Sequence, residues 1–304
     1  MDTEVIIKTA SGAERVSVLF SEFPDQDSHC VVEDCDKVAD KPVLIMHSLY
    51  PDQNNQLVKL VLLLSALKDA GAVSVAVFVP YLPYSRQDKK HVAGEAVSLD
   101  VVLSFMANAG CDQLYTIDCH FMKGAAQCER AGLSIKNFSA GKRLLDHCRS
   151  VLSNEDLQII GPDEGAKYLL DGTRSGHMKK LRGGYGELAK GNSYRKIAEL
   201  KSEHLDITCG DIVIVDDMIS TGSTLIKAID NLKNQGAKNI SCVASHGLFI
   251  GDAYQKINKL CSNIVVSDTI NHLKSVPVVD DLLIEKIIPD WFKLDPASTD
   301  HTRI

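Results

Sequence analysis

The chain has 304 residues, a length that suits two domains or one large α/β domain. Apolar residues make up 45% and charged residues 24% of the chain, which is ordinary for a globular protein in water. Its 33 basic and 40 acidic residues give a formal net charge of −7, which disfavours nucleic acid as a partner because that partner calls for a basic face.

Cysteine spacing and apolar runs exclude further classes of protein. The nine cysteines are scattered and no two are spaced as Cys-x-x-Cys, so the sequence predicts neither a disulfide framework nor a zinc site. The opening residues MDTEVIIK lack the layout of a signal peptide, and the most apolar window, residues 57–67, is short and contains Lys59. We therefore expect a cytoplasmic protein without a membrane partner.

In the first half of the chain, short apolar runs alternate with patterns at helical spacing. The apolar runs predict strands at residues 43–46, 73–79 and 114–117. Leu57, Leu60 and Leu64 predict a helix over residues 53–70 that stops at Gly71, and a second helix is expected over residues 99–109.

The second half repeats this rhythm, with strands expected at residues 157–160, 212–215, 240–244 and 263–266 and a helix at 225–235. Strands that alternate with helices predict parallel sheets covered on both faces. The sequence thus predicts an α/β fold with two domains, residues 1–145 and 146–304, each a mainly parallel sheet flanked by helices. The tail from Asp281 carries no motif; it contains the only tryptophan, Trp291, and is expected to pack against one of the domains.

Residues 210–224, GDIVIVDDMISTGST, combine a β-branched strand, two adjacent carboxylates and a small polar loop before a helix. The free N–H groups and the dipole at a helix start favour an anion, and phosphate is the expected guest. Asp216 and Asp217 would repel that phosphate, so they suit a vicinal diol or Mg²⁺, and a phosphorylated sugar satisfies both halves. An ordinary strand-to-helix connection with a Ser/Thr cap is the alternative, and loop chemistry alone does not decide.

Polar residues follow directly after several predicted strands, at Pro80–Asp88, at Asp118 with His120, at Asp163, and at Asp216 with Asp217. Ligands of open α/β sheets bind beyond the carboxyl ends of the strands. Packing does not explain this clustering, so we expect a binding site there.

The pattern Asp216-Asp217-x-x-x-Thr221-Gly222-x-Thr224 resembles the signature shared by phosphoribosyltransferases and phosphoribosyl pyrophosphate (PRPP) synthetases. The resemblance implies phosphoribosyltransferase-like domains in which the acidic pair holds the ribose 2- and 3-hydroxyls. It also implies that the loop Ser220, Thr221, Gly222, Ser223 and Thr224 holds the 5-phosphate. This motif alone does not separate the two groups of enzymes.

Two further segments are similar to PRPP synthetases alone. Pro80–Lys90 resembles their ATP-binding loop, which implies that Arg86, Gln87 and Asp88 orient ATP, and Gly94–Ser98 continues the match in the style of the shorter archaeal-type members. Residues 23–27, FPDQD, resemble the family's hairpin that reaches into a neighbouring subunit. By that resemblance Phe23 stacks on adenine, Asp25 and Asp27 accept from its amino group, and the protein is a homo-oligomer.

The remaining motifs concern metal binding and catalysis. Asp118–Cys119–His120 and Pro162–Asp163–Glu164–Gly165 are similar to the family's D-x-H and P-D-x-G, which implies that His120 and Asp163 serve Mg²⁺ as cofactor. Lys180–Leu181–Arg182 resembles the K-x-R at the base of a mobile loop. Lys180, Arg182 and His120 are thereby the implied catalytic residues, although Lys190 or Arg195 could supply the cations instead.

The chain also departs from the family pattern. Phe121–Ala126 replaces the usual run after the D-x-H histidine, Gln26 and Asp27 replace Gly and Glu in the hairpin, and Ser220 stands where the longer enzymes have Asp. Residues 33–41 lack the Arg of an element linked to allosteric phosphate and ADP binding, so regulation is left open.

The resemblance spans residues 20–269 and implies a ribose-phosphate pyrophosphokinase, which converts ATP and ribose 5-phosphate into PRPP and AMP. Two alternatives stay open. A phosphoribosyltransferase would share the central loop but would have no use for residues 84–90, and a catalytically silent, regulatory homologue would account for the altered stretch after His120.

Overall fold

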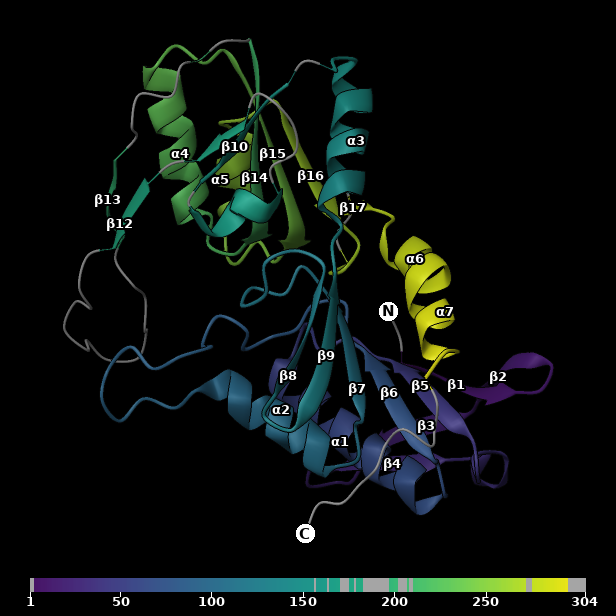
Figure 1. Ribbon diagram of the computed structural model, residues 1–304. Coiled ribbons are helices and arrows are strands. Elements are labelled where there is room, and N and C mark those ends of the chain that lie inside the picture. The colour runs from purple at the N-terminus through teal and green to yellow at the C-terminus, as the bar shows by residue number, and fades with distance from the viewer. Residues whose placement is uncertain are drawn as a thin grey trace. The chain divides into compact units, whose positions relative to one another are not determined.

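The computed structural model describes residues 3–155, 157–162, 164–169, 175–177, 179–182, 197–201, 207, 210–271 and 275–294. The chain folds into two compact units (Figure 1). The first unit is the chain up to Ser139 together with the segment that starts at Val279, and the second is Ala140–Val278.

The first unit is built on a seven-stranded sheet with the order β2-β1-β5-β6-β7-β9-β8. The four strands β5, β6, β7 and β9 run parallel to one another, while β1, β2 and β8 pair antiparallel at the margins. Nearly every residue of β5, β6 and β7 is buried, which is typical of parallel strands covered on both faces. The strands are β1 (Glu4–Thr9), β2 (Gly12–Val16), β5 (Pro42–Met46), β6 (Ser74–Phe78), β7 (Gln113–Ile117), β8 (Ala126–Arg130) and β9 (Leu133–Phe138).

Helices α1 (Gln53–Asp69) and α2 (Ser98–Asn108) cover one face of this sheet. Leu60 and Leu64 of α1 and Leu103 of α2 are buried in one core with Val75 and Val77 of β6. A hairpin of β3 (Val18–Glu22) and β4 (Ser28–Val32) forms its own two-stranded sheet, and β4 packs against α1. A short 3₁₀ turn, η1 (Cys35–Lys37), follows the hairpin.

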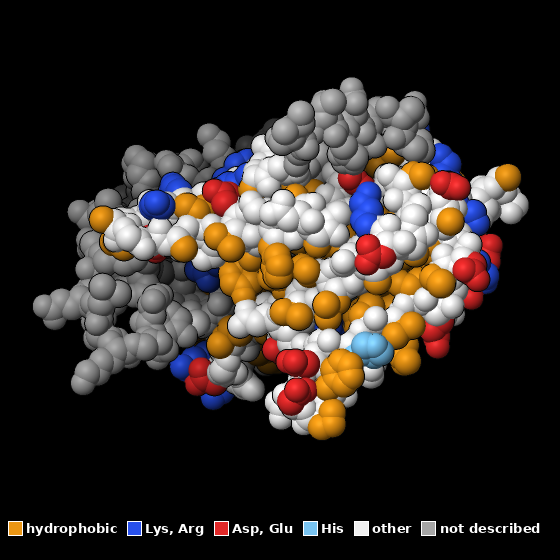
Figure 2. All heavy atoms as spheres, turned by 90° about the horizontal axis from the view of Figure 1, so that it is seen from below, with side chains coloured by type: hydrophobic (Ala, Val, Ile, Leu, Met, Phe, Trp, Pro, Cys, Tyr) orange, Lys and Arg blue, Asp and Glu red, His pale blue; other side chains and the backbone are white. Residues whose placement is uncertain are grey.

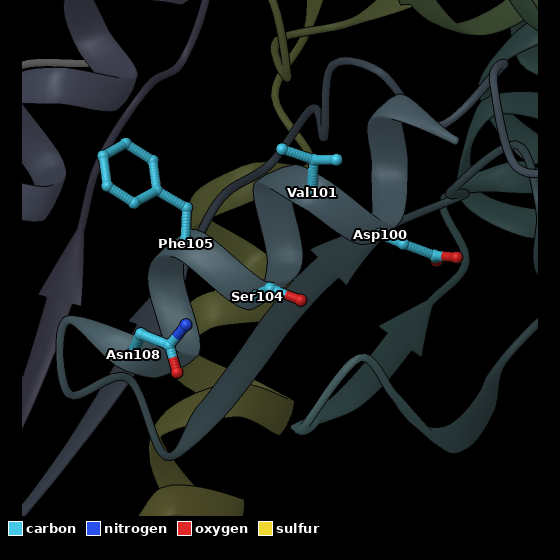
Figure 3. Close-up of a pocket in the computed structure, with 5 residues that line it drawn as sticks. All are labelled: Asp100, Val101, Ser104, Phe105 and Asn108. Carbon is cyan, nitrogen blue, oxygen red and sulfur yellow. The ribbon is translucent and has the colours of Figure 1, made fainter. Parts of the chain in front are cut away.

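The outer surfaces of α1 and α2 expose apolar side chains, namely Val58 and Leu62 on α1 and Val101 and Phe105 on α2. Figure 2 looks at this side of the first unit and shows hydrophobic side chains gathered over it. Figure 3 shows a shallow hollow along α2, lined by Asp100, Val101, Ser104, Phe105 and Asn108.

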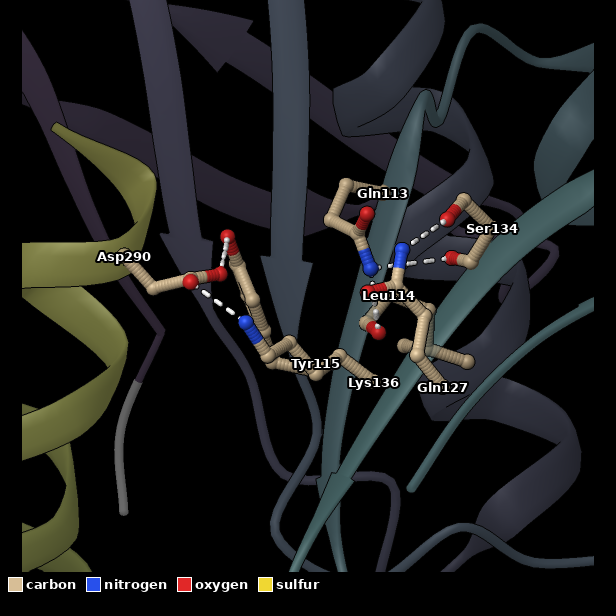
Figure 4. A network of polar contacts seen from close by, with 7 residues as sticks. All are labelled: Gln113, Leu114, Tyr115, Gln127, Ser134, Lys136 and Asp290. Atoms are coloured by element: carbon tan, nitrogen blue, oxygen red, sulfur yellow. Dashed lines mark hydrogen bonds and ion pairs between the residues drawn. The ribbon is translucent and has the colours of Figure 1, made fainter. Parts of the chain in front are cut away.

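The last described segment packs on the first unit rather than on the second. It consists of α6 (Val279–Leu282), a π-helical turn η3 (Leu283–Ile287) and α7 (Ile288–Trp291). Asp290 accepts hydrogen bonds from Tyr115 Oη of β7 at 3.1 Å and from Lys136 Nζ of β9 (Figure 4). These two residues alternate along their strands with Leu114 and Ile135, which face the α1/α2 core, so the tail lies on the opposite face of the sheet.

The second unit is built on a six-stranded sheet with the order β11-β10-β14-β15-β16-β17, in which every pair is parallel. Helices α4 (Ser223–Asn234) and α5 (Ala253–Asn258) cover one face through Ile229, Leu232 and Ile257. Helix α3 (Gly141–Leu152) packs on β15 and β16. The other elements are β10 (Gln158–Gly161), a 3₁₀ helix η2 (Glu164–Leu169), β11 (Ser175–His177), β12 (Lys179–Arg182), β13 (Ile197–Lys201), β14 (Asp211–Ile219), β15 (Asn239–Gly247), β16 (Asn263–Ser267) and β17 (Ser275–Val276).

The predicted α/β fold is confirmed, and each predicted strand and helix has a counterpart in the structure. Two boundaries differ. The sequence division at residue 145 assigned the tail to the second domain, whereas contacts of Asp290 with the first sheet join it to the first unit. Strand β14 runs on to Ile219 instead of ending before Asp216, because its pairing with β15 continues as far as Ile219 and Gly247.

The cysteines that the structure describes are free thiols, and Cys111, Cys119, Cys148 and Cys242 are buried. In the described parts of the chain, no helix is both long enough and apolar enough to cross a membrane.

Candidate active site

In the first unit, the loops after β6 and β7 leave neighbouring parallel strands at the same edge of the sheet. Ile117 N donates to Pro80 O at 3.3 Å, and Val79 N donates to Tyr115 O at 2.9 Å, so the ladder continues to the last residues of both strands. The sheet thus brings the segment Pro80–Lys90 beside Asp118 and His120, as the sequence predicted from strand ends.

The segment Pro80–Lys90 has an anchored first part and an exposed second part. Tyr81, Leu82 and Ser85 are buried, and Tyr84, which has a φ of 62°, donates from its hydroxyl to Asn54 Oδ1 at the start of α1. Arg86, Lys89 and Lys90 are exposed. The buried part fixes the loop, while the cationic side chains stay accessible to an anion.

The far end of this loop is held against α2. Leu99 N donates to Gln87 O at 3.3 Å, and Arg130 donates from Nη2 to Asp88 O at 2.5 Å and from Nε to Asp100 Oδ1 at 2.6 Å. The carboxylate of Glu95 accepts hydrogen bonds from the backbone N–H groups of His91 (2.5 Å) and Val92 (3.2 Å). The hydrogen bond from His91 lowers the pKa of the Glu95 carboxyl below its usual value.

Asp118 and His120 lie in a tight turn after β7. Asp118 is fully buried with a φ of 37°, an uncommon conformation for a residue other than glycine, and its N–H donates to Phe138 O at 2.8 Å. His120 is half-buried. Asn137 of β9 accepts from Cys119 N at 2.9 Å and donates to Gly124 O at 2.7 Å, so it ties together the turn and the stretch in which the sequence departs from the family.

The hairpin residues Phe23–Asp27 form a tight turn that is exposed to solvent. Phe23 N donates to Asp27 O at 2.9 Å, and Gln26, at the position where the family has Gly, has a φ of 73°. Phe23 is 53% exposed, and its ring centroid lies 5.2 Å from that of His29. The structure thus presents Phe23 on an exposed tip, away from any core.

In the second unit, the loop Ser220–Thr224 joins β14 to α4 at the carboxyl edge of the sheet. Gly222 is the residue that caps α4, and its φ of 73° lies in the left-handed region. A Cβ at Gly222 would lie 2.8 Å from Ile257 Cδ1 of α5, so both the backbone and the packing require glycine here. Because glycine has no side chain to accept from the first N–H groups of α4, those donors suit an anion.

The two carboxylates before this loop have different surroundings. Asp217 is 6% exposed, while Asp216 is half-buried and accepts from Asp217 N at 2.9 Å through Oδ1. Thr221 Oγ1 and Ser223 Oγ lie 3.2 Å apart and hydrogen bond to each other. Carboxylates, hydroxyls and helix N–H groups therefore gather within one stretch of nine residues, Asp216–Thr224.

The structure does not describe the side chains of several predicted site residues. Asp163, Lys190 and Arg195 lie outside the described residues. Lys180 and Arg182 belong to β12, whose backbone pairs antiparallel with β13 and is irregular between Leu181 and Arg182. Their roles therefore remain predictions.

The predicted Mg²⁺ can be compared with the donors that are present. Among the described residues, no three His, Cys, Asp or Glu side chains gather in a group that could hold a metal ion. This donor set fits Mg²⁺ that is bound mainly through substrate phosphates and water, which is its usual mode, rather than a cage made by the protein.

Comparison with known proteins identifies the class first. Residues 134–281 match the family described as phosphoribosyl transferase domain. A crystal structure of phosphoribosylpyrophosphate synthetase from Mycobacterium smegmatis superposes with a TM-score of 0.73 at 21% identity, over 91% of this chain and 90% of that one. The chain therefore has the phosphoribosyltransferase type of α/β fold.

Further matches identify the family. Residues 4–110 match the N-terminal domain of ribose phosphate pyrophosphokinase. The chain is 32% identical over 267 residues to ribose-phosphate pyrophosphokinase of Methanopyrus kandleri, with 85% of each chain covered. It is also 32% identical over 260 residues to that of Sulfurisphaera tokodaii, with 85% of this chain and 86% of the relative covered. The chain belongs to the ribose-phosphate pyrophosphokinase family.

Sequence reasoning missed the residues that hold these loops in place. Asn54, Arg130 and Asn137 support the first-unit loops from distant parts of the chain. In the second unit, Leu248 N and Phe249 N both donate to Ile219 O at 3.0 Å. No local pattern marks such residues, although the glycines at 247 and 251 signal a tight turn beside the loop.

Proposed function

We propose that this protein is an active ribose-phosphate pyrophosphokinase, which transfers the β,γ-diphosphoryl group of ATP to the anomeric hydroxyl of ribose 5-phosphate. The products are PRPP and AMP. Membership of the family supports the proposal, because relatives of that name match the chain across both units.

The observation that carries the proposal is the stretch Asp216–Thr224. A phosphorylated sugar needs an anion site and hydrogen-bond acceptors for hydroxyls a few ångströms apart. The glycine-capped start of α4 supplies the first, and the adjacent carboxylates of Asp216 and Asp217 supply the second. An ordinary strand-to-helix connection has no need of two carboxylates at this place.

In the proposed reaction, the anomeric hydroxyl of the sugar attacks the β-phosphorus of ATP and AMP leaves. The protein's part is to position the reactants and to stabilise charge. The loop Ser220–Thr224 holds the 5-phosphate, Asp216 and Asp217 accept from the ribose hydroxyls, and Arg86, Gln87 and Asp88 orient ATP.

The cations complete this assignment. Lys180 and Arg182 neutralise negative charge that develops on the transferring oxygens, and His120 and Asp163 would serve the Mg²⁺ sites. Mg²⁺, when bound with ATP, screens the phosphate charge and withdraws electron density from phosphorus. Lys190 or Arg195 of this chain could supply these side-chain cations instead.

We expect the active form to be a homo-oligomer. The exposed Phe23 at the hairpin tip and the exposed apolar side chains of α1 and α2 support this expectation, because isolated proteins rarely expose large contiguous apolar patches (Figure 2). Without a partner subunit, Phe23 would remain in water.

The proposal is tested by incubating the purified protein with ATP, ribose 5-phosphate and Mg²⁺ and separating the nucleotides by chromatography. AMP that forms only when the sugar phosphate is present supports the synthetase. A phosphoribosyltransferase would leave ATP intact and consume PRPP in the presence of a base. A silent homologue would give no product alone but would change the rate of an active partner.

A variant tests the role of Lys180. Lys180→Ala is expected to lower kcat by about 10²–10³-fold, the usual cost of losing a donor to developing charge, with little change in the binding of ribose 5-phosphate. Steady-state kinetics and calorimetric titration with ribose 5-phosphate measure the two quantities. A loss of equal size in both would show that Lys180 acts in binding rather than in turnover.

A further inference from the structure

The loop that follows β15 lies directly behind the sugar-phosphate loop of the second unit. Leu248 N and Phe249 N donate to Ile219 O at 3.0 Å, and Ile250 N donates to Ser220 O at 3.1 Å. Three consecutive N–H groups of one loop thus hold the last two carbonyls before Thr221.

These hydrogen bonds fix the direction of the neighbouring N–H groups. Among the described residues the only cis peptide is Tyr50–Pro51, so the peptide units that join Ile219 to Ser220 and Ser220 to Thr221 are trans. In a trans unit the N–H points opposite to the C=O. With the carbonyls of Ile219 and Ser220 turned toward residues 248–250, the N–H groups of Ser220 and Thr221 point away from that segment.

Phe249 holds the segment in the required shape. Its φ of 46° is left-handed, a conformation that a residue with a bulky side chain rarely adopts unless its surroundings impose it. Its ring meets that of Tyr254 of α5 edge-on, with centroids 5.2 Å apart at 88°. A Cβ at Gly247 would lie 2.6 Å from Phe249 Cε2, so the ring occupies the space left by that glycine.

A second contact comes from the same part of the chain. Ile257 of α5 packs against Gly222, where a Cβ would lie 2.8 Å from Ile257 Cδ1. Helix α5 therefore supports the loop at its C-terminal end, while residues 248–250 support it at its N-terminal end. The loop is supported on both sides by the segment that follows β15.

We propose that Phe249 is a positioning residue for the sugar-phosphate site: by locking residues 248–250 it orients the N–H groups of Ser220 and Thr221 toward the bound 5-phosphate. This inference rests on the proposed function, because it assigns that loop to ribose 5-phosphate. Phe249 itself does not touch the ligand.

The test compares the affinities of variants of the whole protein for ribose 5-phosphate and for ATP, each by calorimetric titration. Phe249→Gly permits the left-handed backbone but removes the ring, and we expect the Kd for ribose 5-phosphate to rise about tenfold because the donors lose their fixed direction. The Kd for ATP is expected to stay unchanged. Lys259→Ala changes an exposed residue at the C-terminal end of α5. It is the control and is expected to change neither Kd.

In Gly247→Ala the added Cβ would clash with the ring of Phe249 and displace it. This variant is therefore also expected to raise the Kd for ribose 5-phosphate. Because both changes act through the ring, the double variant is expected to lose less than the sum of the two single losses. If Phe249→Gly fails to fold, Phe249→Leu keeps apolar bulk and is expected to give a smaller rise in the same Kd.

Two results would overturn the inference. One is unchanged binding of ribose 5-phosphate by a folded Phe249 variant while the parent protein binds it. The other is an equal loss of ATP affinity, which would indicate general loosening. If the parent protein itself binds no ribose 5-phosphate, the proposed function fails and this inference fails with it.

Discussion

His47 shows how a single buried side chain links this fold to pH. It follows β5 and is 1% exposed, with Nδ1 2.8 Å from Thr3 Oγ1 and Nε2 3.0 Å from Gln56 O. Because the carbonyl can only accept, Nε2 carries the proton of the neutral ring. Burial lowers the pKa of His47 from 6.5 to about 4, so the folded protein keeps the ring neutral.

The sign of the pH effect follows from this shift. Between pH 6.5 and 4 the unfolded chain binds a proton at His47 that the folded chain does not, so the free energy of unfolding falls as pH falls. We expect His47 to contribute a loss of about 2 kcal/mol between pH 7 and pH 5. Urea unfolding at both values measures it, with His47→Gln as the matched variant. An equal pH slope in the variant would contradict the assignment.

At Gly222 the local sequence predicted the backbone turn but not the packing contact. Its place in a Thr-Gly-x-Thr loop predicted a turn at a helix start, and the structure gives the left-handed φ that such a turn requires. Its contact with Ile257, by contrast, depends on how α5 packs against α4, and no local pattern contains that information.

At the scale of elements, the tail from Val279 to Leu294 joins the first unit through a polar network. Asp290 of α7 pairs with Lys136 and accepts from Tyr115 Oη, as Figure 4 shows. Burial, and then the charge of Asp290, raise the pKa of Tyr115, so its phenol remains a neutral donor. Lys8 Nζ adds a hydrogen bond to Phe292 O at 2.8 Å.

Asp290→Asn tests this connection. The change keeps the shape of the side chain but leaves Lys136 without its counter-charge on a half-buried surface. We expect the free energy of unfolding of the first unit to fall by about 1–3 kcal/mol. Denaturant unfolding followed by tryptophan fluorescence reports it, since Trp291 is the only tryptophan and is 1% exposed. Asp280→Asn, an exposed change on α6, is the control, and equal stability of the two variants would contradict the account.

The elements that the sequence predicted are those with local signals. Apolar runs marked β5, β6, β7, β14 and β15, and leucines at helical spacing marked α1. The strands β8 and β9 and the hairpin of β1 and β2 were missed. Most residues of β2 and β8 are exposed, β1 and β9 combine buried with half-buried residues, and the pairing partners decide the structure of all four strands. The last four residues of β14 were missed because the neighbouring strand, not their own composition, extends the ladder.

At the scale of the whole molecule, each unit has a sheet with neighbouring parallel strands, although the first sheet also has antiparallel strands at its margins and the second is entirely parallel. The structure places Pro80–Lys90 and Asp118 with His120 after their strands, as predicted, whereas Asp216 and Asp217 lie within β14, which ends only at Ile219. The supporting residues Asn54, Arg130, Asn137 and Phe249 could not be predicted, because each acts across a long separation in sequence.

The central claim is that this chain transfers a diphosphoryl group from ATP to the anomeric hydroxyl of ribose 5-phosphate and releases AMP. Phosphorus NMR of the purified protein with ATP, ribose 5-phosphate and Mg²⁺ tests it most directly, because it identifies every phosphorus product at once. The account predicts that the signals of ATP give way to those of AMP and of a diphosphate attached to carbon 1 of the sugar, in equal amounts. Two results would contradict this. One is the appearance of ADP together with a sugar phosphate that has gained a single phosphoryl group, and the other is unchanged ATP beside intact ribose 5-phosphate.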